Sequence, residues 1–251
     1  MNAILEVKHA TRRFGGLVAV DDVSFTVPSK GVTAVIGPNG AGKTTLFNII
    51  AGTFPPSEGA ILLGGADITA LKPEAKAARG LVRTFQLVKL FQDLTAIENV
   101  KVGFHLKTRG GLFASLVRPA WFRKAEQDVE EGAAALLDLV GLTKVAHSSA
   151  AVLPYGQQRL LEIARALAAR PQILLLDEPA AGLNAEESER LAKTIRRIAA
   201  DGTAVLLIEH DMKLVMDIAD EVGVLVYGRK IAQGSPDAVK KDPAVIAAYL
   251  G

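Results

Sequence analysis

Short apolar runs rich in β-branched residues alternate along this chain with segments whose apolar residues recur at helical spacing. Up to residue 85 the apolar runs predict strands at residues 3–9, 18–27, 31–36, 60–63 and 81–85. The helical spacing predicts helices at 46–51 and 73–79. A turn-like segment, residues 12–16, separates the first two strands.

From about residue 95 to residue 150 the pattern becomes mostly helical, with few strand signals. The clearest helix there covers 126–140 and stops at Gly141. A further helix is predicted at 157–169. This region therefore predicts a helical subdomain inserted into the chain.

Alternation returns after residue 170. It predicts strands at 173–176, 204–208, 222–226 and 230–233, and helices at 185–200, 211–219 and 243–250. Residues 173–176 are all apolar, as in a central parallel strand that is covered on both faces. The whole pattern predicts an α/β core with a helical insert.

Composition changes this picture little but excludes several functions. The 251 residues are 49% apolar and 22% charged, which is ordinary for a soluble globular protein. The net charge of +2 is too small to indicate a nucleic-acid partner, and the lack of cysteine excludes disulfides and thiolate metal sites. The chain has no apolar run of about 18 residues. We therefore expect no transmembrane segment. The N-terminus reaches a charged residue already at Glu6, so we expect no signal peptide either.

One segment fits the phosphate-binding pattern Gly-x4-Gly-Lys-[Ser/Thr] without a mismatch. It consists of Gly37, Pro38, Asn39, Gly40, Ala41, Gly42, Lys43, Thr44 and Thr45. A predicted strand precedes it and a predicted helix follows it, so its glycines let backbone N–H groups wrap a polyphosphate at a helix N-terminus. We expect Lys43 to reach the β- and γ-phosphates and the Thr44 hydroxyl to hold Mg²⁺.

Two carboxylates, Asp177 and Glu178, follow the buried strand at 173–176. The carboxyl end of such a strand is where open α/β sheets bind ligands. Downstream of a phosphate-binding loop, Asp177 is placed to hold Mg²⁺ through water, and Glu178 to orient or deprotonate the water that attacks the γ-phosphate. The alternative is an exposed acidic strand end.

Four further features are ambiguous when each is taken alone. Gln86 follows a predicted strand, where a glutamine is usually a solvated loop residue. His210 follows a buried strand and could touch a γ-phosphate, although a lone histidine is more often structural. Phe14 lies in a loop after the first strand, where it could stack on adenine or belong to the core. Residues 153–157 precede a helix and offer either N–H groups to an anion or a plain helix start with Pro154 near the first turn.

In order and spacing, these features together resemble the ATP-binding cassette (ABC) ATPases, from about Ile4 to the end of the chain. The resemblance implies an α/β P-loop NTPase (RecA-like) core with N-terminal antiparallel β-strands and an inserted α-helical subdomain. It places the core at about residues 1–88 and 171–251, and the helical subdomain with the signature motif at about 89–170. Together they form one domain, residues 4–250.

The resemblance also assigns roles to these residues. The catalytic set is Glu178, His210, Lys43 and Gln86. The metal set is Thr44, Gln86 and Asp177. The nucleotide-binding set is Phe14, the loop from Gly37 to Thr45 and, from a second subunit, Tyr155, Gly156 and Gln157.

The implied ligands are ATP and Mg²⁺, and the implied partners are other subunits. A second ABC ATPase forms a head-to-tail homo- or heterodimer with the chain, and two ATP molecules lie between the phosphate loop of one subunit and the signature of the other. ATP-driven closure moves polytopic transmembrane permease subunits, which receive solute from a periplasmic or extracellular solute-binding protein. We therefore expect a peripheral protein on the cytoplasmic face of the inner (plasma) membrane, with no nucleic acid bound.

Two motifs depart from the usual family sequence. In the signature, usually Leu-Ser-Gly-Gly-Gln, Pro154 and Tyr155 replace Ser and the first Gly. Pro154 has neither a hydroxyl nor an N–H to face a γ-phosphate. Asn184 stands where the loop after Glu178 usually has Asp. A nucleotide-binding scaffold without turnover is therefore one alternative function.

A narrower resemblance, to the ATPase subunits of branched-chain amino-acid importers, comes from residues 82–86, 155–158, 208–212 and 248–251. ATPases for urea, other amino acids or lipopolysaccharide export share much of this pattern, and a soluble ABC ATPase without transport is a further alternative. The stretch 105–125 holds basic and large apolar residues and no acidic one. It is either a surface for anionic headgroups or the membrane partner, or a hairpin with its apolar residues packed inward.

Overall fold

The computed structural model describes residues 3–84, 89–104 and 120–250. It divides into two compact units, the first made of residues 1–86 and 172–251 and the second of residues 87–171. Gln86 and most of the basic stretch at 105–125 lie outside the described residues, so the interpretations placed on them stay predictions.

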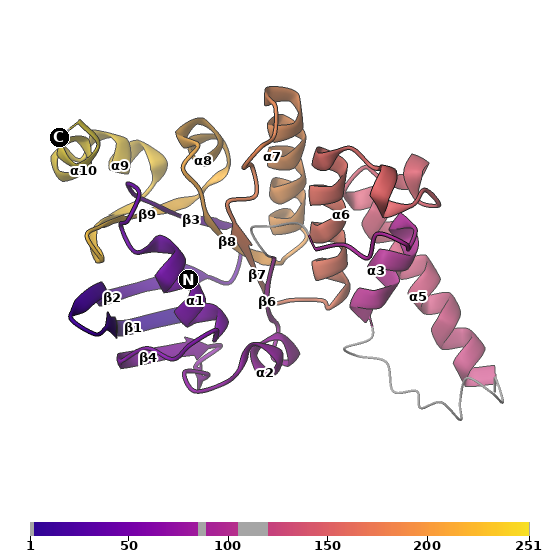
Figure 1. Cartoon of the computed structure of the whole chain (residues 1–251), viewed down its shortest axis with the longest axis horizontal. Coiled ribbons are helices and arrows are strands. Elements are labelled where there is room, and N and C mark those ends of the chain that lie inside the picture. Colours follow the sequence, from indigo (N-terminus) through magenta and orange to yellow (C-terminus); the bar gives the residue numbers. More distant parts are fainter. Residues whose placement is uncertain (1–2, 85–88, 105–119, 251) are drawn as a thin grey trace. The chain divides into compact units, whose positions relative to one another are not determined.

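The first unit begins with an antiparallel sheet in the strand order β2-β1-β4-β5 (Figure 1). Its strands are β1 (Ala3–Phe14), β2 (Leu17–Pro28), β4 (Glu58–Leu63) and β5 (Ala66–Asp67). The predicted end of the first strand at residue 9 is wrong, because β1 continues to Phe14 and the turn is confined to Gly15 and Gly16. Register shifts against β2 between Val7 and Arg13 interrupt the alternation that a sequence pattern relies on.

A second sheet of the same unit has the strand order β10-β9-β3-β8-β7-β6. Its strands are β3 (Val32–Ile36), β6 (Leu81–Arg83), β7 (Ile173–Asp177), β8 (Ala204–Ile208), β9 (Glu221–Val226) and β10 (Arg229–Gly234). The pairs from β9 to β6 are parallel, and β9 and β10 form an antiparallel hairpin. Every residue of β3, β7 and β8 is buried, as predicted for covered central strands.

The helices of the first unit are α1 (Lys43–Ala51), α2 (Pro73–Ala78), α7 (Ala185–Ala200), α8 (Met212–Ile218), α9 (Pro236–Lys241) and α10 (Pro243–Leu250). A buried apolar cluster joins side chains of α1, such as Phe47 and Ile50, to side chains of both sheets. This shared core fixes α1, and with it the loop before α1, against the strands. The predicted α/β fold with N-terminal antiparallel strands and a helical insert is confirmed.

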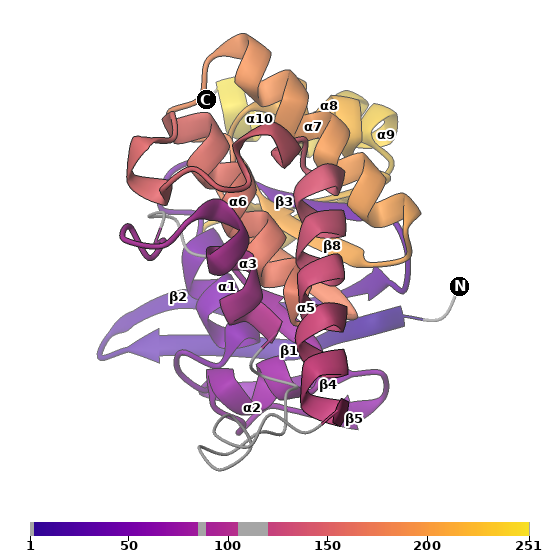
Figure 2. The ribbon, with the colours of Figure 1, turned by 90° about the vertical axis from the view of Figure 1, so that its right-hand side faces the viewer.

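The second unit is helical, with α3 (Ala96–Phe104), α5 (Ala120–Leu139) and α6 (Tyr155–Ala168) packed on one another (Figure 2). Two short 3-10 helices, Thr143–Val145 and Ala150–Val152, lead from α5 to α6. A Cβ on Gly103 would lie 2.2 Å from the Arg165 carbonyl oxygen, so glycine permits the close approach of α3 and α6.

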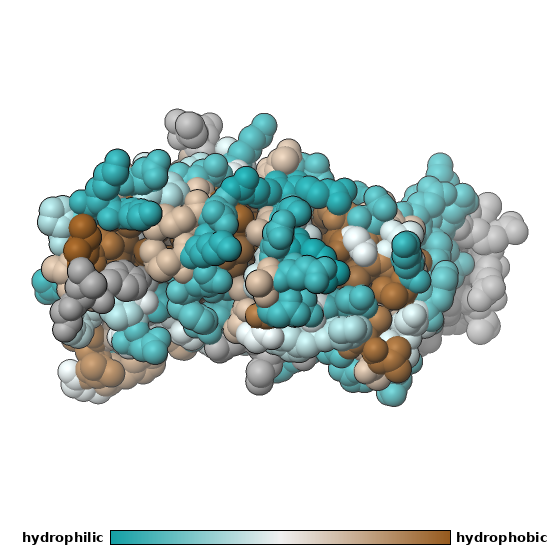
Figure 3. Space-filling view, turned by 90° about the horizontal axis from the view of Figure 1, so that it is seen from above, coloured by the Kyte–Doolittle hydropathy of each residue, from teal (hydrophilic) through white to brown (hydrophobic). Residues whose placement is uncertain are grey.

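On the face shown in Figure 3, hydrophilic side chains predominate and apolar ones occur in separate patches. Within the described ranges, no helix is both long and apolar enough to cross a membrane.

Candidate functional site

The loop at residues 37–45 connects β3 to the first turn of α1. Gly37 and Gly42 have positive φ angles of 154° and 96°. A Cβ on Gly37 would lie 2.1 Å from the Leu225 carbonyl oxygen, and one on Gly42 would lie 2.4 Å from the Ala19 carbonyl oxygen. The loop backbone therefore lies directly against neighbouring strands, and only glycine fits at these two positions.

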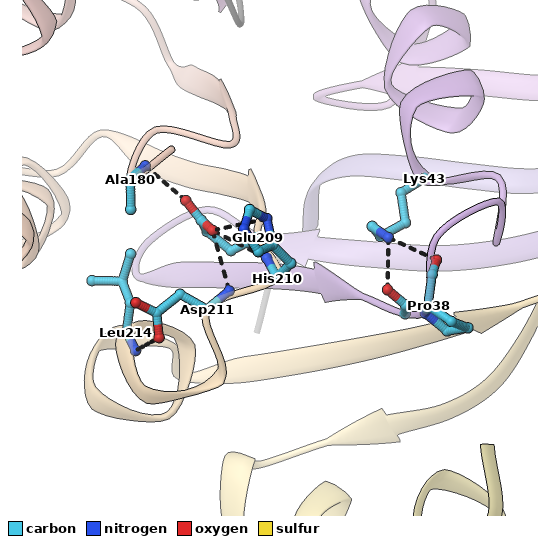
Figure 4. A network of polar contacts seen from close by, with 8 residues as sticks. Pro38, Lys43, Ala180, Glu209, His210, Asp211 and Leu214 are labelled. Carbon is cyan, nitrogen blue, oxygen red and sulfur yellow. Dashed lines mark hydrogen bonds and ion pairs between the residues drawn. The ribbon is translucent and has the colours of Figure 1, made fainter. Parts of the chain in front are cut away.

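Lys43 begins α1, and its side chain turns back over this loop (Figure 4). The Nζ atom donates hydrogen bonds to the carbonyl oxygens of Gly37 at 2.6 Å and Pro38 at 3.0 Å. Burial lowers the pKa of Lys43, and the charge of Glu178 partly opposes this shift. Thr44 is exposed and Thr45 is half-buried. The two hydrogen bonds thus hold the Lys43 ammonium group against the backbone of the glycine-containing loop.

Asp177 ends β7, and Glu178 follows it at the carboxyl edge of the parallel strands. The Asp177 side chain is 3% exposed, and its Oδ2 atom accepts a hydrogen bond from Arg83 Nη2 at 2.5 Å. Arg83 lies on the neighbouring strand β6 and also donates to Asn48 Oδ1 of α1 at 2.7 Å. Arg83 thus balances the buried charge and joins β7 to α1. The sequence reasoning missed it, because the pairing of β6 with β7 is needed to see it.

The oxygen atoms of Asp177 and Thr44 are ligands of the kind that Mg²⁺ takes, with water and phosphate oxygens filling the other positions. Across the residues that the structure describes, no group of three or more His, Cys, Asp or Glu side chains could hold a metal ion. An Mg²⁺ ion held by Asp177 and Thr44 would need further oxygen ligands from water or phosphate.

His210 follows β8, which pairs with β7 so that Ile208 lies opposite Asp177. The His210 side chain is 61% exposed. Its neighbour Glu209, by contrast, is fully buried. The Glu209 carboxylate accepts hydrogen bonds from backbone N–H groups of the loop after β7 and of the loop after β8 (Figure 4). Within the first unit the charge of Glu178 acts on the Lys43 ammonium group. Glu178 and His210 follow the neighbouring strands β7 and β8 at the same sheet edge. Sequence reasoning did not single out Glu209, and its place directly after a buried strand was the available signal.

Phe14 lies at the end of β1 and not in a loop, which corrects the predicted position. Phe14 is 43% exposed, and its ring packs edge-on against that of Phe54, with centroids 5.5 Å apart. The Arg12 guanidinium lies 4.8 Å from the Phe14 ring centroid and 4.7 Å from that of Phe54. These contacts hold the ring in place while part of it remains open to a stacking partner.

The predicted signature lies in the second unit, where α6 begins at Tyr155 with Pro154 as its N-cap residue. The N–H groups of the first turn, including those of Gly156 and Gln157, are the ones that a helix leaves without intrahelical partners. Below them, Arg159 and Glu162 form a buried ion pair at 3.0 Å. Arg159 also donates to the Tyr155 hydroxyl at 3.3 Å. The sequence reasoning did not identify this i,i+3 pair.

A family described as "ABC transporter" matches residues 20–181, and a second, described as "Branched-chain amino acid ATP-binding cassette transporter", matches residues 229–251. The loop at 37–45 and the carboxylates Asp177 and Glu178 lie within the first match. The chain therefore belongs to the ABC transporter family, as the order of its motifs predicted, and is an ATP-binding cassette.

Individual proteins similar to this chain are named as components of branched-chain amino acid transport. The chain is 48% identical over 249 residues to the "High-affinity branched-chain amino acid transport ATP-binding protein BraF" of Pseudomonas aeruginosa, covering 99% of this chain and 98% of that protein. It is 44% identical, with the same coverage, to the corresponding protein LivG of Escherichia coli K12. A crystal structure of the ADP conformation of an ABC-transporter cassette superposes with a TM-score of 0.86 at 32% identity, covering 100% of both chains.

Proposed function

We propose that this chain is the ATP-hydrolysing subunit of an importer for branched-chain amino acids. The observation that carries the choice of solute is the match of residues 229–251 to the branched-chain amino-acid family. The names of BraF and LivG, which align over 98% of their own lengths, support the same choice.

Hydrolysis is assigned to the edge of the parallel strands in the first unit. Lys43 and the loop N–H groups neutralise phosphate charge, and Phe14 stacks on the adenine. Glu178 orients the attacking water and His210 contacts the γ-phosphate. Phosphoryl transfer depends on positioning and charge stabilisation more than on covalent help, so this set of groups is sufficient.

Thr44, Asp177 and Gln86 are assigned to Mg²⁺, which, when bound, neutralises charge that develops on the phosphates. In this structure the Arg83 guanidinium balances the charge of Asp177, and a bound cation would add further positive charge beside that carboxylate. The assignment of Gln86 rests on its sequence position alone.

We assign the residues Tyr155, Gly156 and Gln157 to the nucleotide of a second subunit. Their place in the first turn of a 14-residue helix supports this, because a helix N-terminus favours a bound anion. The chain would then act as a head-to-tail dimer beneath polytopic permease subunits, on the cytoplasmic face of the membrane. A solute-binding protein would supply the amino acid.

The test is to purify the chain with whatever accompanies it from detergent-solubilised membranes and to reconstitute the complex in vesicles. We expect a polytopic membrane protein, and ATP hydrolysis that rises when leucine and its binding protein are added. A complex stimulated by urea or by another solute, but not by leucine, isoleucine or valine, would contradict the choice of solute. Absence of any membrane protein would favour a soluble ABC ATPase.

A second candidate, a nucleotide-binding scaffold without turnover, is motivated by Pro154. A proline at the N-cap of α6 has no side-chain oxygen to bond the first-turn N–H groups or a phosphate. The reconstituted complex separates the two functions. Steady release of phosphate supports the ATPase, and binding of ATP without phosphate release supports the scaffold.

A further inference from the structure

Glu209 is a fully buried carboxylate that has no part in the roles assigned above. It follows β8 directly and precedes His210. Its side chain is 0% exposed, whereas glutamates are almost never fully buried unless they are paired. Because burying a charge is costly, the groups that compensate for it indicate what the residue does.

Both carboxylate oxygens of Glu209 accept hydrogen bonds from the backbones of two different loops (Figure 4). Oε1 accepts from the Ala180 N–H at 2.8 Å, in the loop after β7. Oε2 accepts from the N–H groups of His210 at 3.0 Å and Asp211 at 3.4 Å, in the loop after β8. Burial raises the pKa of Glu209, while these bonds oppose the rise. The carboxylate therefore bridges the two loops, and we call these contacts the Glu209 bridge.

The loop after β7 has a strained start that the bridge helps to hold. Glu178 has a left-handed backbone with φ of 46°, which is unfavourable for a residue with a side chain. Its N–H donates to the Ile208 carbonyl at 3.0 Å, which ties one end of the turn to β8. Two residues on, the bond from Ala180 to Glu209 ties the other end to the residue that directly follows the same strand. A strained residue persists only where its surroundings over-determine it, and these two bonds supply that constraint.

The loop after β8 is anchored by the same carboxylate. Asp211 caps α8, since its Oδ1 accepts from the Leu214 N–H at 3.1 Å. The bonds from His210 and Asp211 to Glu209 Oε2 therefore fix the short segment between β8 and α8. The His210 ring projects from that segment, with its Nδ1 atom 3.9 Å from Oε2. Its backbone is thus fixed although its ring is largely exposed.

We propose that Glu209 is a positioning residue for ATP hydrolysis, because the Glu209 bridge sets the position of Glu178 relative to His210. The proposal rests on the roles assigned above to Glu178 and His210. An ionised carboxylate only accepts hydrogen bonds, which suits a site that presents backbone N–H donors from both sides. An amide in its place would turn an NH₂ group toward at least one of those donors.

The test compares Glu209→Gln with Asp220→Asn in the reconstituted complex. The Asp220 carboxylate also accepts a backbone N–H, from Val32 at 2.8 Å, but Val32 begins β3 and the phosphate loop follows the other end of that strand. In Glu209→Gln we expect kcat for ATP to fall about 100-fold, as when catalytic groups are displaced, at an unchanged KM. In Asp220→Asn we expect wild-type kcat. Equal losses of kcat in both variants, or a raised KM with wild-type kcat in Glu209→Gln, would overturn the proposal.

Amide hydrogen exchange gives a readout that does not need turnover. We expect faster exchange at Ala180, His210 and Asp211 in Glu209→Gln than in Asp220→Asn. Unchanged exchange at these amides refutes the bridge. A wild-type reconstituted complex that protects them but releases no phosphate contradicts the proposed ATPase function instead, so the two failures are distinguishable.

The variant Glu209→Asp covers the case in which the glutamine variant does not fold. It keeps the charge but is one methylene shorter, so we expect protection to be kept at His210 and Asp211 and lost at Ala180. If the Ala180 amide loses its protection, kcat should fall about 100-fold, as we expect for Glu209→Gln. Wild-type kcat with an unprotected Ala180 amide would show that the bridge does not position the site.

Discussion

The ion pair between Arg83 and Asp177 offers a direct probe of the proposed magnesium site. The change Arg83→Met removes the guanidinium and keeps much of the side-chain volume. The side chains are 14% and 3% exposed, so the variant leaves a buried carboxylate without its cation. Removing one partner of such a pair costs about 3–5 kcal/mol, and we expect about 3 kcal/mol because Arg83 keeps some contact with water. For a chain of this length Tm changes by about 2–4 °C per kcal/mol, so Tm should fall by about 6–12 °C.

Bound Mg²⁺ and nucleotide should reduce this loss, because the ion brings positive charge to Asp177. The assay is thermal unfolding of wild type and Arg83→Met, each with and without MgADP. We expect MgADP to raise the Tm of the variant by more than it raises the Tm of wild type.

The matched control is Arg13→Met, which removes an arginine from the exposed pair with Glu58, whose side chains are 47% and 63% exposed. Exposed pairs contribute about 0–1 kcal/mol, so this variant should unfold close to wild type. Equal falls in Tm for the two variants would refute the cost assigned to the buried charge. An equal effect of MgADP on wild type and Arg83→Met would refute the placement of Mg²⁺ beside Asp177.

Three other predictions concern the phosphate loop and the helix after it. Lys43→Ala should lose most ATP affinity in a titration with a fluorescent nucleotide, and wild-type affinity would count against the whole site. Gly42→Ala should lower Tm more than Gly40→Ala, since both glycines have positive φ but only Gly42 would meet a backbone atom, the Ala19 carbonyl oxygen at 2.4 Å. Burial lowers the pKa of Lys76, which donates to carbonyls at the end of α1, to about 8 from 10.5. Between these two pKa values the unfolded chain binds more protons than the folded chain, so the free energy of unfolding should increase with pH. In urea unfolding, wild type should therefore gain stability relative to Lys76→Met as the pH rises from 8 to 10.5. Parallel pH profiles of the two proteins would contradict this.

The central strands were predictable because each one is a continuous apolar run that can be recognised in the local sequence. Residues 173–176 and 204–208 are continuous apolar runs, and β7 and β8 are buried along their whole length. Strand β1 was less accessible to the same reasoning. Its bulges against β2 break the alternation of faces, so the pattern ended at residue 9 although the strand reaches Phe14.

Some residues of the candidate site were likewise predictable from local sequence, and others were not. The phosphate loop and the carboxylates Asp177 and Glu178 were found because a motif and a buried strand end carry their chemistry in the local sequence. Arg83 meets Asp177 across 94 positions of sequence, and Glu209 meets Ala180 across 29. Such partners are set by which strands are neighbours and where their loops turn. That information arises from the sheet order and not from any local pattern.

The central claim is that this cassette hydrolyses ATP with Glu178 as the residue that directs the attacking water. The most direct test is the rate of phosphate release by the reconstituted complex carrying Glu178→Gln, together with its ATP affinity. We predict wild-type ATP affinity and turnover at least about 100-fold slower, because the amide keeps the shape of the side chain but loses the charge and basicity. Turnover equal to that of wild type would contradict the account.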